Sequence, residues 1–372
     1  MSGLSGLSGL SGLSGLSGLS GLSGLSGLSG LSGLSGLSGL GGGTVASEAL
    51  TLSRFATSGP FEGPVVDPAT PPFNQPDNLR LWADEPRVTA IFTELAQGLS
   101  FPAERRTEKA GLAYTDLDAR TPRRQALLML RAPDRAILNR QMELVAAYAD
   151  LRGDRGAEIL AQMTPPVDFW AGVIGLQAHR HKKTLQVMDL AFSLAVHVEM
   201  RFKHMFAVVR PVELSPQIQP MIATPGHGAW PSGHATEAFI MAHVLASLLK
   251  AARPGRKHHK GNEATEVQLQ RLAARIAVNR TVAGVHYPVD SAVGRMLGTV
   301  LGQFLVARAQ GGQMREHGFD GLKFHGPDGQ PQDFEPQQPL DSGAGSVHGK
   351  PHRIDAGPLL SWLWQDAIKE WQ

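Results

Sequence analysis

The sequence predicts an all-α core, a helical bundle, with an extended arm on its N-terminal side. Apolar residues recur at the three- and four-residue spacing of a helix in five segments, and strand signals are weak throughout. Residues 44–86 are instead rich in Pro, Gly and Thr, which is typical of an extended arm wrapped on a core. With 372 residues and 42% apolar content, the chain is long enough to bury a sizeable core.

The arm is preceded by thirteen copies of Ser-Gly-Leu at residues 2–40. Glycine at every third position is also the collagen pattern, but this repeat has no proline to hold polyproline II geometry. Because ordering a glycine-rich chain costs much entropy, we expect residues 1–43 to be a disordered, low-complexity segment. The regular leucines leave self-association of this segment as an alternative.

The five expected core helices are spread over the middle of the chain. Their apolar stripes cover 138–151, 187–202, 238–249, 267–278 and 289–304, and the last helix opens at Pro288, a favoured first-turn position.

These stripes suggest a division of the chain into four parts. After the repeat and the arm, we expect a helical domain that holds the candidate catalytic residues at 87–315, with its motif core at 203–298. A loop-rich C-terminal segment follows at 316–372. It ends in an apolar helix at 358–371, which we expect to dock on the core, with partner binding as the alternative.

Composition excludes several classes of function. A net charge of +2 gives no general attraction to nucleic acid or to an anionic membrane. The absence of cysteine excludes disulfides, thiolate metal sites and cysteine nucleophiles. The longest apolar stretch, 238–249, is too short for a membrane helix, and no ordinary signal peptide follows Met1. We expect a soluble protein, in a compartment that composition does not decide, and a homo-oligomer is compatible with the sequence.

Three short segments form an anion-binding set. They are Lys203 with Arg210-Pro211, then Pro231-Ser232-Gly233-His234, then Arg280 with His286 and Asp290. Three permanent cations, two histidines, a hydroxyl and a glycine amide are suited to a tetrahedral oxyanion.

The second segment directly precedes a predicted helix. The amides of Ser232 and Gly233 can therefore point at an anion with the helix dipole behind them, and glycine lets the backbone come close. His234 is placed to give or take a proton at the bound group. A helix cap is the structural role of Ser232, and both roles can hold together.

The third segment pairs an imidazole with a carboxylate. Asp290 stands four residues after His286, so the two side chains share a helix face. A carboxylate on one imidazole nitrogen sets the tautomer and leaves the other nitrogen facing the site as a nucleophile or ligand.

Taken together, the three segments resemble the tripartite signature shared by type 2 phosphatidic acid phosphatases (the PAP2 superfamily), bacterial class A acid phosphatases and vanadium haloperoxidases. The resemblance covers residues 203–298 and implies the α-helical bundle of that family. One departure is Asn279, where many members have serine before the arginine.

Carried over by motif match, the resemblance implies which residues hold the oxyanion. These are Lys203, Arg210 and Arg280, helped by Ser232 and the Gly233 amide. Such preorganised donors stabilise the charge that develops on five-coordinate phosphorus.

The resemblance also implies the roles of the reacting residues. His286 would attack phosphorus to form a phosphohistidine, or ligate vanadium axially. His234 would protonate the leaving oxygen and later activate water, and Asp290 would orient His286.

A site for a divalent metal is a separate alternative. His227, His234, Glu237 and His286 can be drawn up as ligands, but three cations converging on the same pocket would repel a metal cation. We therefore expect no metal and no other cofactor, except vanadate in the haloperoxidase alternative.

The choice between phosphatase and haloperoxidase depends on local features. The run from His286 to Asp290, His-Tyr-Pro-Val-Asp, resembles the form common in the phosphatases. His227 stands seven residues before His234, where algal bromoperoxidases carry a histidine that influences halide chemistry. A loop histidine that lines the pocket is the simpler interpretation, and Trp230 is a second candidate for the pocket wall.

Three hypotheses follow for the function. The leading one is a soluble, metal-independent phosphomonoesterase that acts on a small phosphate ester through phosphohistidine. The second is a vanadium-dependent haloperoxidase that uses hydrogen peroxide and halide. The third is a catalytically silent anion-binding protein.

Overall fold

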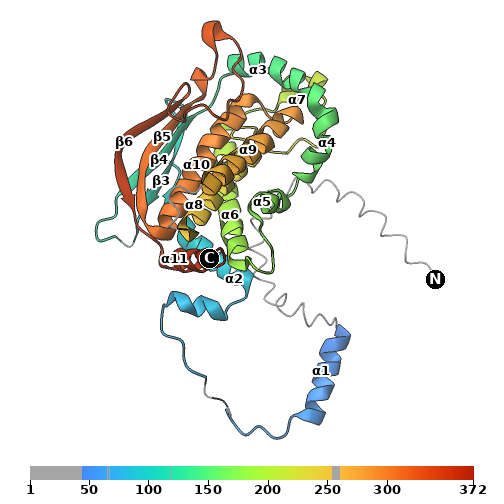
Figure 1. Cartoon of the computed structure of the whole chain (residues 1–372), viewed down its shortest axis with the longest axis vertical. Coiled ribbons are helices and arrows are strands. Elements are labelled where there is room, and N and C mark those ends of the chain that lie inside the picture. The colour runs from blue at the N-terminus through green and yellow to red at the C-terminus, as the bar shows by residue number, and fades with distance from the viewer. Residues whose placement is uncertain (1–43, 65, 67, 118, 254–259) are drawn as a thin grey trace, which may run out of the picture.

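The computed structural model describes residues 44–64, 66, 68–117, 119–253 and 260–372 (Figure 1). The Ser-Gly-Leu repeat, and with it the expectation of disorder, lies outside the described residues. The predicted arm contains helix α1 (Thr44–Thr57) and the short 3-10 helix η3 (Pro76–Leu81).

The five predicted core helices are present. They are α3 (Arg135–Tyr148), α6 (Lys182–Phe206), α8 (Gly233–Ala252), α9 (Lys260–Val282) and α10 (Pro288–Gln310). Around them lie the shorter helices α2 (Asp84–Ala96), α4 (Arg152–Ala161), α5 (Val167–Ile174), α7 (Pro211–Leu214) and α11 (Pro358–Lys369). Single 3-10 turns are η4 (Ala149–Leu151), η5 (Pro216–Ile218), η6 (Gly321–Lys323) and η7 (Pro327–Gly329).

The prediction of an all-α fold is wrong, because a six-stranded sheet covers one side of the helices. Its strands are β1 (Leu99–Ser100), β2 (Ala103–Glu104), β3 (Lys109–Thr115), β4 (Arg124–Arg131), β5 (Gly312–Asp320) and β6 (Gly345–Ile354). The strand order is β1-β3-β4-β5-β6, with β2 paired to β3. The β4–β5 pair is parallel and the others are antiparallel, so the sheet is mixed.

The strands were not predicted from the sequence, for two different reasons. The apolar run of β4 is short, and periodicity alone does not separate such a run from a buried helix segment. By contrast β6 is mostly polar and carries Pro351, which a sheet tolerates on an edge strand. Its pairing with β5 comes from tertiary contact, with Phe319 opposite Gly345.

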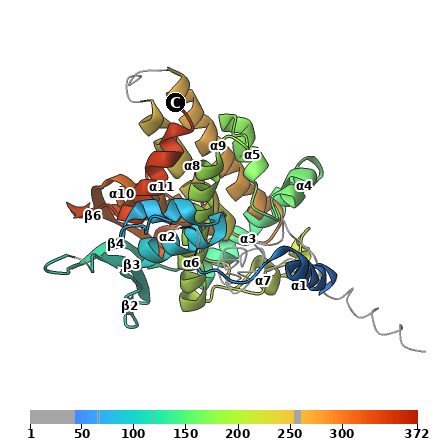
Figure 2. The ribbon, with the colours of Figure 1, turned by 90° about the horizontal axis from the view of Figure 1, so that it is seen from below.

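The sheet encloses the helical part of the chain between two of its strands. β4 ends at Arg131 and β5 begins at Gly312, so the whole of 132–311 is the crossover between two parallel neighbours. Seen from below, β3, β4 and β6 lie on the opposite side of α8 and α10 from α4 and α5 (Figure 2).

The pairing of α8 with α10 forms the centre of the core. Gly294, Gly298 and Gly302 recur at four-residue spacing along α10 and face α8. A Cβ at Gly298 would lie 2.4 Å from the carbonyl oxygen of Thr236, so the two backbones approach closer than any side chain allows. This contact holds the N-terminal ends of α8 and α10 side by side, where two of the three sequence segments lie.

The predicted C-terminal helix, α11, packs its apolar face against the core through Leu360, Leu363 and Trp364, all fully buried. Among the described residues, one helix, α8, is long and apolar enough to cross a membrane by length and composition alone. In this fold 67% of its apolar window is buried. A buried core helix can have the same length and composition as a membrane helix, so this observation is weak evidence for a membrane span.

Candidate active site

The structure brings the three sequence segments together around one pocket. Lys203 comes from the last turn of α6, Gly233 and His234 from the start of α8, Arg280 from the last turn of α9 and His286 from the turn before α10. All five residues line the pocket. The segment 162–166, which connects α4 to α5, lines it as well.

The start of α8 joins the second and third segments directly. The Ser232 hydroxyl accepts a hydrogen bond from the Ala235 amide (3.4 Å), so this serine is the helix cap. The Ser232 amide donates to the backbone oxygen of Asp290 (3.0 Å). A Cβ at Gly233 would lie 2.5 Å from Oε1 of Glu199, so a larger residue here would force that carboxylate to move.

His286 and Asp290 form the expected buried pair. The Asp290 carboxylate accepts from His286 Nδ1 (2.8 Å) and from the Tyr287 amide (3.0 Å). With Nδ1 as the donor, Nε2 of His286 carries the lone pair and faces Arg210, whose Nη1 lies 3.0 Å away. Burial and the Arg210 charge lower the pKa of His286 well below its ordinary value, which keeps this imidazole neutral.

Arg210 is not among the residues that line the pocket, but its guanidinium contacts two that are, His286 and His227. Besides His286, its guanidinium donates to the carbonyl oxygens of Val285 (2.8 Å), His227 (3.1 Å) and Gly228 (3.2 Å). These backbone acceptors hold the Arg210 guanidinium beside His286, the candidate nucleophile. They also satisfy its donors inside the protein, where the side chain is only 2% exposed.

Lys203 is held by carbonyl oxygens in the same way. Its Nζ donates to Pro231 (2.5 Å) and lies 3.4 Å from the oxygen of Gly228. Burial lowers the pKa of Lys203 to about 8, against the opposing effect of nearby Glu199.

Arg280 presents the free donors of the pocket. Its Nη2 donates to the side-chain oxygen of Gln162 (3.1 Å) and the carbonyl of Ile159 (3.3 Å). Its buried Nε and Nη1 have no hydrogen-bond partner in the part of the chain that the structure describes. Two unpaired donors on one planar cation are suited to two oxygens of a tetrahedral anion.

His234 has its tautomer set by a backbone oxygen. Its Nε2 lies 3.0 Å from the carbonyl of Gln162, which can only accept, so Nε2 carries the proton and Nδ1 the lone pair. Burial, and next the charge of Arg280, lower the pKa of His234 to about 3. At neutral pH this imidazole is a base unless a bound anion offsets the arginine.

The two additional wall candidates differ in position. His227 lines the pocket, and its Nδ1 lies 3.1 Å from Nη2 of Arg210; burial lowers its pKa to about 4. Trp230 is fully buried and is not among the lining residues of the pocket. Its indole packs edge-on against Phe206, with ring centroids 4.7 Å apart, and near Phe319 of the sheet, so it supports the site from the core.

The anion-binding set predicted from the sequence did not include three polar residues at this pocket. Glu199 and Glu237 line it, and Gln162 supports Arg280 and His234 from the end of α4. Glu199 stands one turn before Lys203, a spacing typical of an exposed helix pair, so its burial was not visible. Glu237 had appeared only as a candidate metal ligand.

These carboxylates change the charge balance of the site. Glu199 and Glu237 line the pocket and Asp290 bonds to His286, so the cations Lys203, Arg210 and Arg280 are not the only ionisable groups near it. Burial raises the pKa of Glu199 and of Asp290 to about 7 each and that of Glu237 well above its ordinary value. Within the described ranges, no three histidine or acidic side chains are grouped so that they could hold a metal ion.

The comparisons with known proteins are consistent with this geometry. The family model described as the PAP2 superfamily matches residues 186–312, the stretch from α6 to the start of β5. No curated protein matches the chain.

A solved structure, described as the first transmembrane PAP2-type phosphatidylglycerolphosphate phosphatase from Bacillus subtilis, is similar to 45% of this chain and 80% of its own. The sequence identity is 21% and the TM-score 0.30, so we draw no argument from that likeness. The family match over 186–312 contains the three segments that meet at the pocket, and this region of the chain is a PAP2 superfamily domain.

Proposed function

We propose that this PAP2 superfamily chain is a metal-independent phosphomonoesterase that works through a phosphohistidine on His286. One observation carries the proposal: a neutral, buried imidazole has one nitrogen on Asp290 and the other 3.0 Å from Arg210 Nη1, at a pocket that Lys203 and Arg280 also line. A neutral imidazole lone pair next to preorganised cations is the arrangement that attack on a phosphoryl group needs.

Substrate binding would use the donors that the fold leaves available. The free edge of Arg280, the amide of Gly233 and the ammonium group of Lys203 bind phosphoryl oxygens. Arg210 exchanges its contact with His286 Nε2 for a phosphoryl oxygen, which frees the lone pair for attack.

The reaction then follows in two balanced steps. The Nε2 lone pair forms a bond to phosphorus while the ester P–O bond breaks, and the leaving oxygen takes a proton from His234. For this, His234 must first be protonated; a bound phosphate dianion beside Arg280 raises its pKa toward that state. Water then gives its proton to His234 and attacks phosphorus, which breaks the P–N bond and releases inorganic phosphate.

We also propose that the enzyme works in solution. Two thirds of the apolar window of α8 is buried against neighbouring helices and is not free to face lipid. Partition of the full chain between detergent-free supernatant and membrane pellet tests this point.

A trapping experiment tests the mechanism. The full chain is mixed with a 32P-labelled aryl phosphate, and acid-labile label on the protein is measured next to phosphate release. We expect His286→Ala to lose both signals and His234→Ala to retain labelling with an aryl leaving group but to turn over only once. Turnover by His286→Ala would contradict the proposal, as would the absence of turnover in the unaltered chain.

A vanadium-dependent haloperoxidase remains the second candidate, because His227 lies at the pocket wall against Arg210. In that case vanadate would take the place of phosphate beside His286. Bromination of an organic trap by the vanadate-loaded protein with peroxide, without phosphate release from the aryl ester, would favour it. Neither activity, with phosphate binding unchanged in His286→Ala, would favour a silent anion-binding protein.

A further inference from the structure

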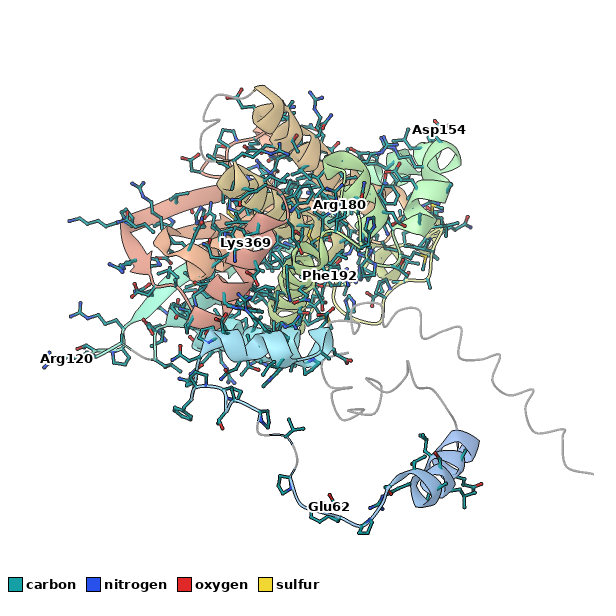
Figure 3. All side chains as sticks on the ribbon, turned by 60° about the horizontal axis from the view of Figure 1, so that its bottom comes forward. Glu62, Arg120, Asp154, Arg180, Phe192 and Lys369 are labelled. Carbon is teal, nitrogen blue, oxygen red and sulfur yellow. The ribbon has the colours of Figure 1, made fainter. Side chains whose placement is uncertain are left out.

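A second chamber opens beside the oxyanion pocket. Its volume is about 300 Å³, and its walls come from α5, α6, α8 and α9. Five residues line both spaces: Pro165, Pro166, Phe192, His234 and Glu237. Phe192, labelled in Figure 3 on α6, is one of the residues at this boundary.

The chamber is lined mainly by apolar side chains. Trp170, Met188 and Met241 are nearly fully buried, and Val167, Leu185, Ala238 and Ile276 complete the apolar wall. The charged or titratable groups on its lining are His234, Glu237 and Asp189. Among the residues that the structure describes, no lysine or arginine lines it, so a second anionic group would meet two acids and no described cation.

The chamber adjoins the residue that would protonate the leaving oxygen. In the proposed reaction that oxygen lies next to His234, and the group attached to it must extend away from His286. The chamber lies next to His234, so its space is available to the organic part of the ester.

We propose that this chamber binds the leaving group of the substrate, and that this group is compact, uncharged and apolar, such as one aromatic ring or a short alkyl chain. The inference rests on the proposed phosphatase function and deepens it. Each methylene group that is removed from water on binding raises the affinity by up to about fourfold.

A series of alkyl phosphates from methyl to octyl, together with phenyl phosphate, tests the proposal on the full chain. We expect kcat/KM to rise with chain length and then level off when the chamber is full. A flat series, or one in which polar glycerol phosphate is the best substrate, would overturn the inference while leaving the phosphatase function intact.

A filled chamber provides the matched test. Leu185 is half-buried at the chamber wall, so Leu185→Trp should lower kcat/KM for octyl phosphate at least tenfold and leave methyl phosphate unchanged. Val167→Phe gives a second filling variant, and Leu160→Trp on an exposed position of α4 is the control. Equal losses for all esters in both filling variants would contradict a role in leaving-group binding.

Binding of alkylphosphonates separates this inference from the proposed function. These compounds are not hydrolysed, so their dissociation constants report the chamber even if the protein turns over no ester. Tighter binding of phenyl- than of methylphosphonate, lost in Leu185→Trp, would support the chamber; equal binding would overturn it.

Discussion

The hydrogen bonds of single residues decide which atoms of this site can react. Arg210 Nη1 and Asp290 hold the two nitrogens of His286, and the Gln162 carbonyl sets the tautomer of His234. Both imidazoles therefore have one defined proton position. Such support by neighbouring groups is what keeps reacting atoms within the tolerance that catalysis needs.

Asn279, the departure from the family pattern, supports Arg280 indirectly. Its Nδ2 donates to Gln162 Oε1 (3.0 Å) and to Glu158 (2.9 Å), and Gln162 Oε1 in turn accepts from Arg280. We predict that Asn279→Ala raises KM and the inhibition constant of phosphate about tenfold, with a smaller effect on kcat, because one charge-assisted contact of Arg280 is weakened.

Steady-state kinetics and phosphate inhibition measure that split. Asn279→Ser keeps a short donor and should recover part of the loss. Arg155→Ala is the matched control, since it removes a partner of Asn279 Oδ1 but leaves Nδ2 in place. An unchanged phosphate inhibition constant in Asn279→Ala would show that Gln162 needs no such support.

At the scale of elements, the close approach of α8 and α10 places the site. The first turn of each helix carries site residues, and the Ser232 amide bonds across to Asp290. A change in packing that moved these two helices apart would therefore also move Ser232–His234 away from His286–Asp290.

We therefore predict that Gly298→Ala destabilises the protein by about 1–3 kcal/mol, because the new methyl group would meet backbone atoms of α8. Thermal unfolding of the full chain measures the change. Gly172→Ala in α5 is the control, since nothing lies within 4 Å of its Cβ position. It should be neutral or stabilising by about 0.4–1 kcal/mol, and equal effects of the two changes would contradict the packing argument.

At the scale of the whole molecule, buried acids and bases near one pocket make stability depend on pH. Burial raises the pKa of Glu199 from 4.5 to about 7, so the folded state holds a proton that the unfolded chain has lost between these values. Stability from this group is present below pH 4.5 and is lost as the pH rises through 7. Lys203 has the opposite sign: its pKa falls from 10.5 to about 8, so stability returns as the pH rises above 8.

We predict that Glu199→Gln flattens the decline of unfolding free energy between pH 4.5 and 7, by about 3 kcal/mol at most. Denaturant unfolding across this range measures it. Glu143→Gln, on an exposed position of α3, is the control and should keep the slope of the unaltered chain. Parallel pH profiles for the unaltered chain and Glu199→Gln would show that Glu199 does not hold a proton in the folded state.

The helices and the three site segments could be predicted because their signals are local. Apolar residues repeat every three or four positions in α6 and α10, Pro288 marks a helix start, and Ser232 caps α8. The spacing of His286 and Asp290 within one turn likewise specifies their contact. Which residue types line the candidate site was therefore determined by the sequence itself.

Only the tertiary structure decided the sheet and the charge balance of the pocket. β4 and β5 pair across 180 intervening residues, and β6 pairs with the edge of β5, which no local pattern in its sequence indicates. Glu199 has the spacing of a surface residue, and only the packing of α6 under Gly233 buries it. Pairing partners and burial depend on chain segments far apart in sequence, whereas periodicity, caps and i,i+4 contacts are determined within a few turns.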